Sequence, residues 1–244
     1  MKLTVDRKEL RNALSTVRRA ANINSSLPVL AAVFVQAGVG KVKLTATDLE
    51  CTITQAVEAR VDQEGAVVLP VELFARVAAA LPGEQVGIET DESGGKLHVL
   101  SGSSHYGLPL LLGEEFPHLP VVEATTTFTA VERELKKALK SVVFATSSQT
   151  IWPKYCGVRF QVLKGSVSFT ATDRHVLADT CLKGFTTGDG VEVSGPSEPL
   201  LDLIACLDSD TEEPVEVGIG TNLIRFSTAD TTVISRLIDG DYPN

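Results

Sequence analysis

Two stretches rich in basic side chains carry the clearest chemical signal of the chain. They span residues 7–19 (RKELRNALSTVRR) and 132–144 (ERELKKALKSVVF). Arginine and lysine side chains of this kind can bind phosphate groups through their charge, without reading a base sequence. Charge runs are more often solvated helix faces. From these residues alone the solvated face is the preferred interpretation, and phosphate binding is the alternative.

The side chains suited to catalysis or metal binding form no known motif. The sequence has no G-x-x-x-x-G-K-[ST], H-E-x-x-H or G-x-S-x-G, and Gly218-Ile219-Gly220 does not extend to G-x-G-x-x-G. Asp173 and His175 could belong to a catalytic triad, but a triad is recognised by its geometry. We therefore expect no enzymatic activity, no cofactor and no metal centre. The histidines and cysteines, none at metal-ligand spacing, are His98, His105, His118, His175, Cys51, Cys156, Cys181 and Cys206.

The composition limits the class of protein. The chain has 244 residues, of which 43% are hydrophobic and 22% are charged, which predicts two domains with ordinary cores rather than a disordered chain. No stretch of about 18 apolar residues is present, and the N-terminus lacks the apolar region of a signal peptide. We therefore expect a cytoplasmic protein without a membrane partner. The net charge of −9, taken by itself, argues against a nucleic-acid binder.

The chain contains an internal repeat with an offset of about 125 residues. LTATD at 44–48 returns as FTATD at 169–173, and ELRNAL at 9–14 returns as ELKKAL at 134–139. The stretch GEEFPH that ends the first repeat returns, one residue further along, as the final six residues DGDYPN. Three matches in the same order indicate two homologous domains. We place these domains at residues 1–121 and 122–244.

Both repeats predict the same order of elements. Apolar residues at helical spacing predict two amphipathic helices in each repeat. The four ranges are 7–19, 71–81, 132–144 and 197–207. Alternating, β-branched residues predict hairpins at 33–45 and 158–170, and further strands at 96–100 and 223–227. Each domain is therefore expected to be α+β, an antiparallel sheet with two helices on one face.

In the order and spacing of its motifs, the chain resembles the bacterial replicative sliding clamps, the beta subunits of DNA polymerase III. The likeness covers essentially the whole chain. The segments that carry it are MKLTV (1–5), LPVL (27–30), LTATDLE (44–50), EFP (115–117), TATDRHVL (170–177) and RLIDGDYP (236–243). The resemblance implies two tandem repeats of the DNA-clamp fold, in a ring of six such domains around duplex DNA with helices lining the hole. It also implies a non-catalytic processivity factor.

One departure from the family is large. The family's chains carry three such domains and close as a head-to-tail dimer, whereas this sequence stops at Asn244, at the closing motif of the second domain. The chain is then either truncated or a two-domain protein, and we favour truncation because it stops just after that motif. Three copies of a two-domain chain would also supply six domains, so a trimeric ring is geometrically possible.

The resemblance changes the interpretation of the charge. Summed over the four expected helices, with the last one extended to Asp208, the formal charge is +3, which leaves −12 for the rest of the chain. A positive inner surface in an acidic shell suits a protein that encircles DNA without gripping it. The acidic helix at 197–207 departs from this pattern. Residues expected to contact DNA are Arg7, Arg11, Arg18, Arg133, Lys136, Lys137 and Lys140, with Gln149 and Lys154 from the following loop. Trp152 in that loop either stacks on a base or packs against the protein.

The resemblance also implies a surface for partners. In the family, DNA polymerase and the clamp loader dock short linear motifs into an apolar pocket beside the second domain's T-x-D-x-H-x-L segment. A few apolar anchors with polar edges suit such a pocket. The matching positions are Tyr155, Thr172, Arg174, His175, Val176, Leu177 and Pro243. The family's third domain supplies the other half of the pocket, so we expect weak peptide binding here. Asp48 and Asp173 are expected to cap turns.

Ring closure is expected at the outer edge of the first domain. The residues at or near the family's subunit interface are Phe74, Arg76, Tyr106 and Leu108, and ordinary core packing is the alternative for them. Two other function classes stay open. The acidic fourth helix favours a non-replicative interaction protein related to the clamps, and an enzyme is the remaining alternative.

Overall fold

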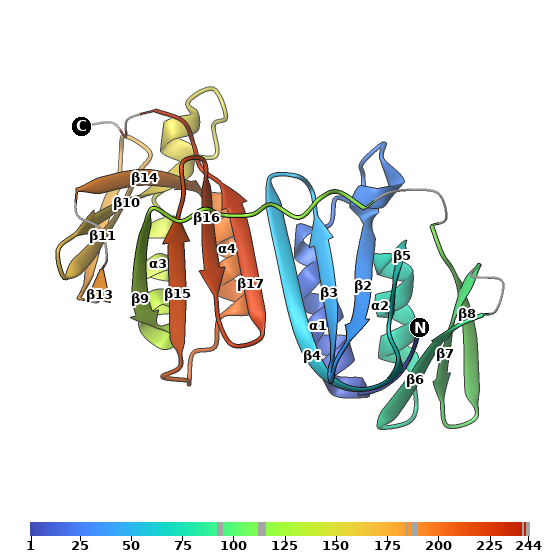
Figure 1. Cartoon of the computed structure of the whole chain (residues 1–244). Coiled ribbons are helices and arrows are strands. Elements are labelled where there is room, and N and C mark those ends of the chain that lie inside the picture. Colours follow the sequence, from blue (N-terminus) through green and yellow to red (C-terminus); the bar gives the residue numbers. More distant parts are fainter. Residues whose placement is uncertain (92–94, 112–115, 184, 187–189, 241, 243–244) are drawn as a thin grey trace. The chain divides into compact units, whose positions relative to one another are not determined.

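The computed structural model describes residues 1–91, 95–111, 116–183, 185–186, 190–240 and 242. The chain divides into two units, Met1–Leu119 (unit 1) and Pro120–Asn244 (unit 2), each with antiparallel strands and two α-helices (Figure 1). The predicted α+β class is confirmed. Within the described residues, no helix combines the length and the apolar character needed to span a membrane.

Unit 1 is one antiparallel array with its two α-helices on the same face (Figure 1). Its described strands are β1 (Lys2–Asp6), β2 (Ala32–Gly38), β3 (Lys41–Thr47), β4 (Cys51–Gln63), β5 (Gly65–Pro70), β6 (Gln85–Thr90), β7 (Lys96–Ser101) and β8 (Ser104–Pro109). The helices are α1 (Arg7–Val17) and α2 (Val71–Ala80), with 3-10 turns at Arg18–Ala20 and Pro28–Ala31. The strand order is β5-β2-β3-β4-β1-β6-β7-β8. Helix α1 packs against α2, β3 and β4.

Unit 2 repeats this arrangement with its strands in two sheets. Its described strands are β9 (Thr126–Val131), β10 (Gly157–Leu163), β11 (Ser166–Thr172), β12 (Leu177–Lys183), β13 (Phe185–Thr186), β14 (Val191–Pro196), β15 (Pro214–Ile219), β16 (Leu223–Ser227) and β17 (Thr231–Arg236). The helices are α3 (Glu132–Val143) and α4 (Ser197–Cys206), with a 3-10 turn at Pro153–Cys156. The orders are β12-β11-β10-β14 and β13-β9-β15-β16-β17. Helix α3 packs against α4 and against strands of both sheets.

The strand register repeats with the offset seen in the sequence. Thr45 of β3 faces Thr54 of β4, and 125 positions later Thr170 of β11 faces Asp179 of β12. Strand β4, with 13 residues, pairs with both β3 and β1. In unit 2 the same two pairings are divided between β12, which pairs with β11, and β13, which pairs with β9. The two units are therefore copies of one fold.

Buried apolar stripes fix the first helix of each unit to its sheet. Leu10, Leu14 and Val17 of α1 are fully buried, and burial of each such side chain stabilises the fold by about 1.5–3 kcal/mol. The Asp6 carboxylate caps α1 by accepting from the backbone N–H groups of Lys8 and Glu9. The α-helix ends at Val17 rather than at the predicted residue 19, because the chain tightens into a 3-10 turn there.

Candidate nucleic-acid interface and peptide surface

The cations of α1 and of the turn that follows it have different surroundings. Arg11 is exposed. Arg18 pairs with Glu72 of α2, with Nε 3.3 Å from Oε1. Arg7 is half-buried and donates from its guanidinium to the carbonyl oxygen of Leu81 at 2.8 Å. Arg11 is thus exposed to solvent, Arg18 in the turn after the helix forms a surface ion pair, and Arg7 is bonded to the neighbouring helix end.

Helix α3 repeats this division of roles. Arg133 pairs with Glu212, with Nη2 3.0 Å from Oε1. Lys136 donates from Nζ to the carbonyl oxygen of Leu207 at 2.5 Å. Lys137 and Lys140 are exposed. The helix therefore offers two solvent-facing ammonium groups, beside one that is bonded to the chain.

Arg7 and Lys136, which were predicted to contact DNA, bind the C-terminal ends of helices α2 and α4. Leu81 and Leu207 are the C-cap residues of α2 and α4. Their carbonyls lie at the negative ends of the helix dipoles, where a cation is stabilising. Arg7 and Lys136 therefore tie the first helix of each unit to the second. Sequence spacing did not reveal this role, because the bonded residues lie 74 and 71 positions apart.

The loop after α3 is closed by its own backbone. The amide of Ser147 donates to the carbonyl of Tyr155 at 2.7 Å, and the amide of Trp152 donates to the carbonyl of Gln149 at 3.1 Å. The side chains of Gln149 and Trp152 are exposed. Lys154 is half-buried, with its ammonium beside Gly240, where an added Cβ would lie 2.8 Å from Nζ. Lys154 therefore presents less surface than Gln149.

The turn after β11 is built around Asp173. The amides of His175 and Val176 donate to its Oδ1 at 2.9 and 2.8 Å. These backbone donors, first that of Val176 and then that of His175, hold the pKa of Asp173 below its ordinary value. Thr172 completes the turn, since its Oγ1 donates to the carbonyl of Val176 at 2.7 Å and accepts from the amide of Arg174.

Unit 1 forms the same turn after β3. The amides of Glu50 and Cys51 donate to Asp48 Oδ1 at 2.9 and 2.7 Å. The φ angle is +79° at Leu49 and +80° at Arg174, a left-handed conformation that is uncommon for residues other than glycine. The prediction that both aspartates cap turns is confirmed.

An aromatic and cationic cluster lies beside the turn of unit 2. The guanidinium carbon of Arg174 lies 5.6 Å from the ring centroid of Trp152 and 5.8 Å from that of Tyr155, within the range of cation–π attraction. Tyr242 accepts from the amide of Thr172 at 3.0 Å through its hydroxyl. Burial raises the pKa of Tyr242. The side chain of Trp152 contacts Arg174 and stays 51% exposed, so both of its predicted roles stay open.

The structure brings three of the predicted groove residues, Tyr155, Thr172 and Arg174, into one cluster. The side chains of Val176 and Leu177 follow it and are 47% and 67% exposed. His175 is exposed as well, and Pro243 lies outside the described residues. This end of unit 2 thus offers apolar side chains next to polar and cationic ones.

Sequence reasoning missed Tyr242 as a member of this surface. The signal was present in the repeat, because Tyr242 matches Phe116 in the closing motifs of the two domains. Phe116 stacks on Phe34 in unit 1, with ring centroids 5.3 Å apart and 18° between the ring planes. The closing motif of each unit therefore packs an aromatic side chain against that unit's strands. In unit 2 this side chain is a tyrosine and has a hydroxyl group, whereas in unit 1 it is a phenylalanine.

The four residues predicted at a subunit interface divide into two groups. Phe74 and Leu108 are buried in the core of unit 1, at 0% and 3% exposure. Their side chains have no surface for a second chain, so the core-packing alternative describes them better than the interface does. Arg76 and Tyr106 are exposed. Tyr106 lies on β8, the last strand of its sheet path.

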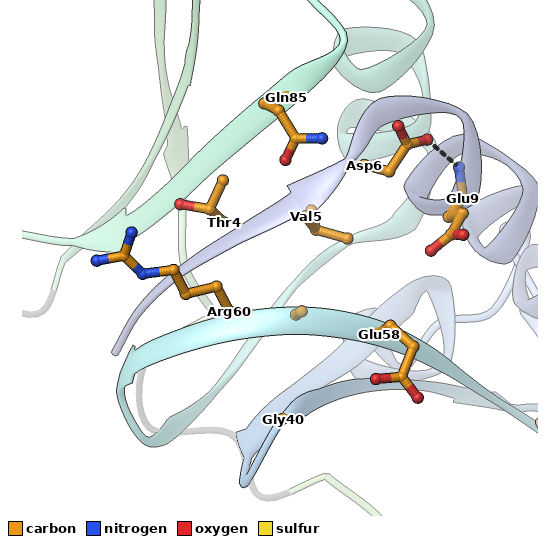
Figure 2. A pocket seen from close by; sticks show the side chains of 9 residues that line it. Thr4, Val5, Asp6, Glu9, Gly40, Glu58, Arg60 and Gln85 are labelled. Atoms are coloured by element: carbon orange, nitrogen blue, oxygen red, sulfur yellow. Dashed lines mark hydrogen bonds between the residues drawn. The ribbon is translucent and has the colours of Figure 1, made fainter.

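No catalytic cluster emerges from the described parts of the chain. In them, no set of three or more His, Cys, Asp or Glu side chains could hold a metal ion. An open groove of about 710 Å³ between β1, β4 and β6 is lined by charged side chains (Figure 2). Among these, Asp6 caps α1, Glu58 pairs with Lys41 and Arg60 pairs with Asp62. The polar groups of the groove serve the fold.

Comparisons with known proteins agree with the two-unit architecture. The N-terminal domain of the DNA polymerase III beta subunit matches residues 1–120, and its central domain matches residues 130–244. Beta sliding clamps of Synechococcus elongatus and Halalkalibacterium halodurans are 32% and 29% identical to this chain. Each alignment covers all of this chain and 66% of the relative.

Solved structures show the same relationship. The DNA polymerase sliding clamp of Bacillus subtilis matches with a TM-score of 0.92 at 27% identity. A sliding clamp of Pseudomonas aeruginosa bound to griselimycin matches with a TM-score of 0.94 at 26% identity. Both alignments cover 100% of this chain and 66% of the other. The chain therefore belongs to the family of DNA polymerase III beta subunits, non-catalytic accessory proteins, and carries their N-terminal and central domains.

Proposed function

We propose that the protein is a sliding-clamp subunit, a processivity factor that surrounds duplex DNA without sequence preference. The observation that carries the proposal is the set of exposed cations on α1 and α3, in a chain whose net charge is −9. Arg11, Lys137 and Lys140 supply this positive surface from repeat-related helices. Acidic residues elsewhere would repel DNA and so confine it to these helices.

The proposed contacts are to phosphate groups, which position a protein on DNA but carry no sequence information. Arg18 and Arg133 add to the surface, because exposed ion pairs such as theirs contribute only about 0–1 kcal/mol and exchange readily for a phosphate. Gln149 is an exposed donor from the loop after α3. Arg7, Lys136 and Lys154 contribute mainly as fixed positive charges, since their side chains are only half-exposed.

The proposed partner surface lies at the Asp173 turn of unit 2. DNA polymerase and the clamp loader would bind there through short linear motifs. Val176 and Leu177 are the apolar anchors, and Thr172, Arg174 and His175 are the polar edge. Tyr155 forms the wall beneath Arg174.

A peptide-binding measurement tests this surface. The double variant His175→Ala with Leu177→Ala should weaken a clamp-binding peptide of DNA polymerase at least tenfold in fluorescence anisotropy. The control is Leu201→Ala on α4, which removes a leucine that is 51% exposed. Undiminished binding by the double variant would place the partner site elsewhere.

Ring closure is proposed at the edge strand β8. An edge strand presents unpaired backbone groups that a strand of a second chain can bind. Tyr106 on β8 and Arg76 on α2 are exposed residues near this edge, while Phe74 and Leu108 support it from the core. Light scattering of the full chain tests self-association: a trimer would supply six domains, and a monomer would require another chain for closure.

Topological retention on DNA tests the clamp mechanism. The assembled protein should stay on nicked circular DNA during gel filtration and should escape when the circle is cut once. Equal retention on circular and linear DNA would refute encirclement, because retention would then come from direct binding.

The acidic helix α4 favours a second candidate function. Glu198 is exposed in its first turn, Asp202 lies within it, and Asp208 is exposed two residues after its end. These carboxylates oppose a close approach of phosphate from this stretch. The alternative is a clamp-related interaction protein that binds peptides but does not encircle DNA. It predicts peptide binding without retention on circular DNA.

A further inference from the structure

Two of the four histidines meet across a hairpin of unit 1. His98 on β7 faces Gly107 of β8, and His105 faces Leu100, so the two histidines are diagonal neighbours. Nε2 of His105 lies 2.9 Å from Nδ1 of His98, and the ring centroids are 4.9 Å apart. One imidazole donates and the other accepts in this hydrogen bond. The sequence did not predict the contact, because the residues are seven positions apart and meet only in the hairpin.

Gly107 leaves open the space beside this contact. A Cβ added there would lie 3.8 Å from His98 Nδ1 and 3.9 Å from His98 Cε1, at the place where the rings approach. With no side chain at this position, His105 can extend along the strand to reach its neighbour. His105 is exposed and His98 is half-buried, so the meeting point is open to solvent.

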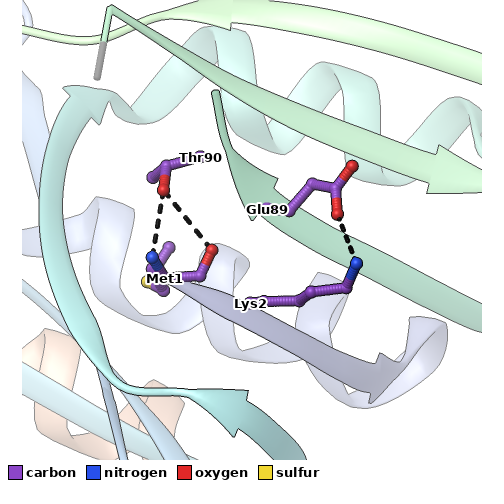
Figure 3. A network of polar contacts seen from close by, with 4 residues as sticks. All are labelled: Met1, Lys2, Glu89 and Thr90. Carbon is purple, nitrogen blue, oxygen red and sulfur yellow. Dashed lines mark hydrogen bonds and ion pairs between the residues drawn. The ribbon is translucent and has the colours of Figure 1, made fainter. Parts of the chain in front are cut away.

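Three charged side chains, Glu89, Lys2 and Lys96, lie on the strands around the pair. Glu89 of β6 faces His98 and Lys2 of β1 faces Glu89, which forms a row across three strands. Lys2 Nζ lies 2.9 Å from Glu89 Oε2 (Figure 3). The ammonium of Lys2 is the main cause of the lowered pKa of Glu89, and the two histidines add to it. Lys96, two residues before His98, brings a further positive charge to this strand.

We propose that His98 and His105 form a surface site for a divalent transition-metal ion, with Cu²⁺ bound more tightly than Ni²⁺ or Zn²⁺. Imidazole nitrogen is a common ligand for these ions. When each of two nitrogens lies about 2.0–2.1 Å from one ion, the distance between them is about 2.9 Å if the N–metal–N angle is a right angle. It is about 3.3 Å if that angle is tetrahedral. The present spacing of 2.9 Å fits the right angle, which is the geometry that Cu²⁺ and Ni²⁺ prefer.

Binding requires only a local change. The proton shared between the rings must move to an outer nitrogen, so that His98 Nδ1 and His105 Nε2 both present lone pairs. In the described parts of the chain no third acidic, histidine or cysteine ligand joins them, so water completes the coordination. Strands β16 and β17, which occupy the corresponding places in unit 2, contain no histidine. The pair is thus a feature of one repeat rather than a requirement of the shared fold.

Titration calorimetry of the full, tag-free chain with CuCl₂ and NiCl₂ tests the proposal. We expect one Cu²⁺ per chain, and at least tenfold weaker binding in His98→Gln and in His105→Gln. His118→Gln and His175→Gln are matched controls that should bind as the unaltered chain does. Copper binding that survives in the double variant His98→Gln with His105→Gln would overturn the proposal, and so would equal losses in all four single variants.

Changes at Gly107 test the geometry while both histidines remain. Gly107→Ala adds a Cβ at ordinary contact distance and should keep copper binding within a factor of about two of the unaltered chain, since no ligand is displaced. Gly107→Val adds two methyl groups where the rings meet and should weaken binding at least tenfold. Circular dichroism checks that both variants fold. Equal binding by the two variants would show that the histidines do not act as a pair. His105 lies on β8, where ring closure is proposed, but the metal titration needs neither DNA nor a peptide, so the two proposals can fail separately.

Discussion

Replacing Arg174 separates two opposing contributions to the stability of the Asp173 turn. These are the strain of the residue's left-handed backbone and the cation–π contacts of its side chain. Its backbone has a φ of +80°, and a residue with a Cβ in this left-handed region is destabilised by about 1–2 kcal/mol. Its guanidinium lies 5.6 and 5.8 Å from the centroids of Trp152 and Tyr155. A cation–π contact at an exposed site contributes about 0.5–1 kcal/mol. The side chain therefore offsets the strain of its own backbone.

The two smallest side chains give different expected results. Arg174→Ala keeps the strain and loses both ring contacts, so the free energy of unfolding of unit 2 should fall by about 1–2 kcal/mol. Arg174→Gly loses the same contacts but relieves the strain, while the greater freedom of glycine in the unfolded chain costs about 0.5–1 kcal/mol. We expect the glycine variant to be more stable than the alanine variant by up to about 1 kcal/mol.

Urea unfolding monitored by tryptophan fluorescence measures these changes. The sequence has one tryptophan, Trp152, so its signal reports unit 2 alone. The control is the repeat-related Leu49 of unit 1, whose φ is +79°; Leu49→Gly and Leu49→Ala, followed by circular dichroism, should show the same gap. An Arg174→Ala chain as stable as the unaltered one would refute the cation–π contribution. Equal stability of glycine and alanine at both positions would refute the strain.

Three further changes test other parts of the structure. Lys137→Glu with Lys140→Glu should weaken DNA association and reduce the slope of log K against log salt by about two phosphate contacts, or roughly 1.8; an unchanged slope in anisotropy titrations would mean that α3 does not face DNA. Tyr242→Phe removes the acceptor of the Thr172 amide and should cost about 0.5–1.5 kcal/mol in urea unfolding, and a neutral result would show that water replaces the hydroxyl. Asp173→Ala should destabilise unit 2 at neutral pH. Because the pKa of Asp173 is lowered in the folded chain, this stabilisation is present above the ordinary value of 3.8 and is lost as the pH falls through the folded pKa; a stability difference that persists in acid would contradict the assignment.

Local patterns account for most of the elements. Leu10, Leu14 and Val17 predict α1 because their spacing matches one helix face, and the structure buries all three. The two aspartate turns were predictable as well, because an Asp after a strand bonds to the amides that follow it. The end of α1 was less predictable, since residues 18 and 19 continue the helical pattern but adopt a 3-10 turn.

Contacts between distant residues were beyond these patterns. Alternation places Tyr106 and Leu108 on the same face of β8, yet Leu108 is buried and Tyr106 is 37% exposed. Helix α2 and strand β5 both contact β8, and strand periodicity does not reveal which of its residues a neighbouring element covers. The hydrogen bond between Arg7 and the carbonyl of Leu81 was equally beyond prediction, because it depends on how two helices pack.

Comparing the two repeats shows which features of the turn are set by the shared backbone and which depend on the side chains of each unit. Leu49 and Arg174 have nearly the same φ, and their turns share the same hydrogen bonds. Phe116 and Tyr242 both return an aromatic ring to the sheet. The backbone that supports the proposed peptide surface thus exists twice. Only unit 2 places a guanidinium over a tryptophan at this turn, so its side chains distinguish the proposed partner site from the matching turn of unit 1.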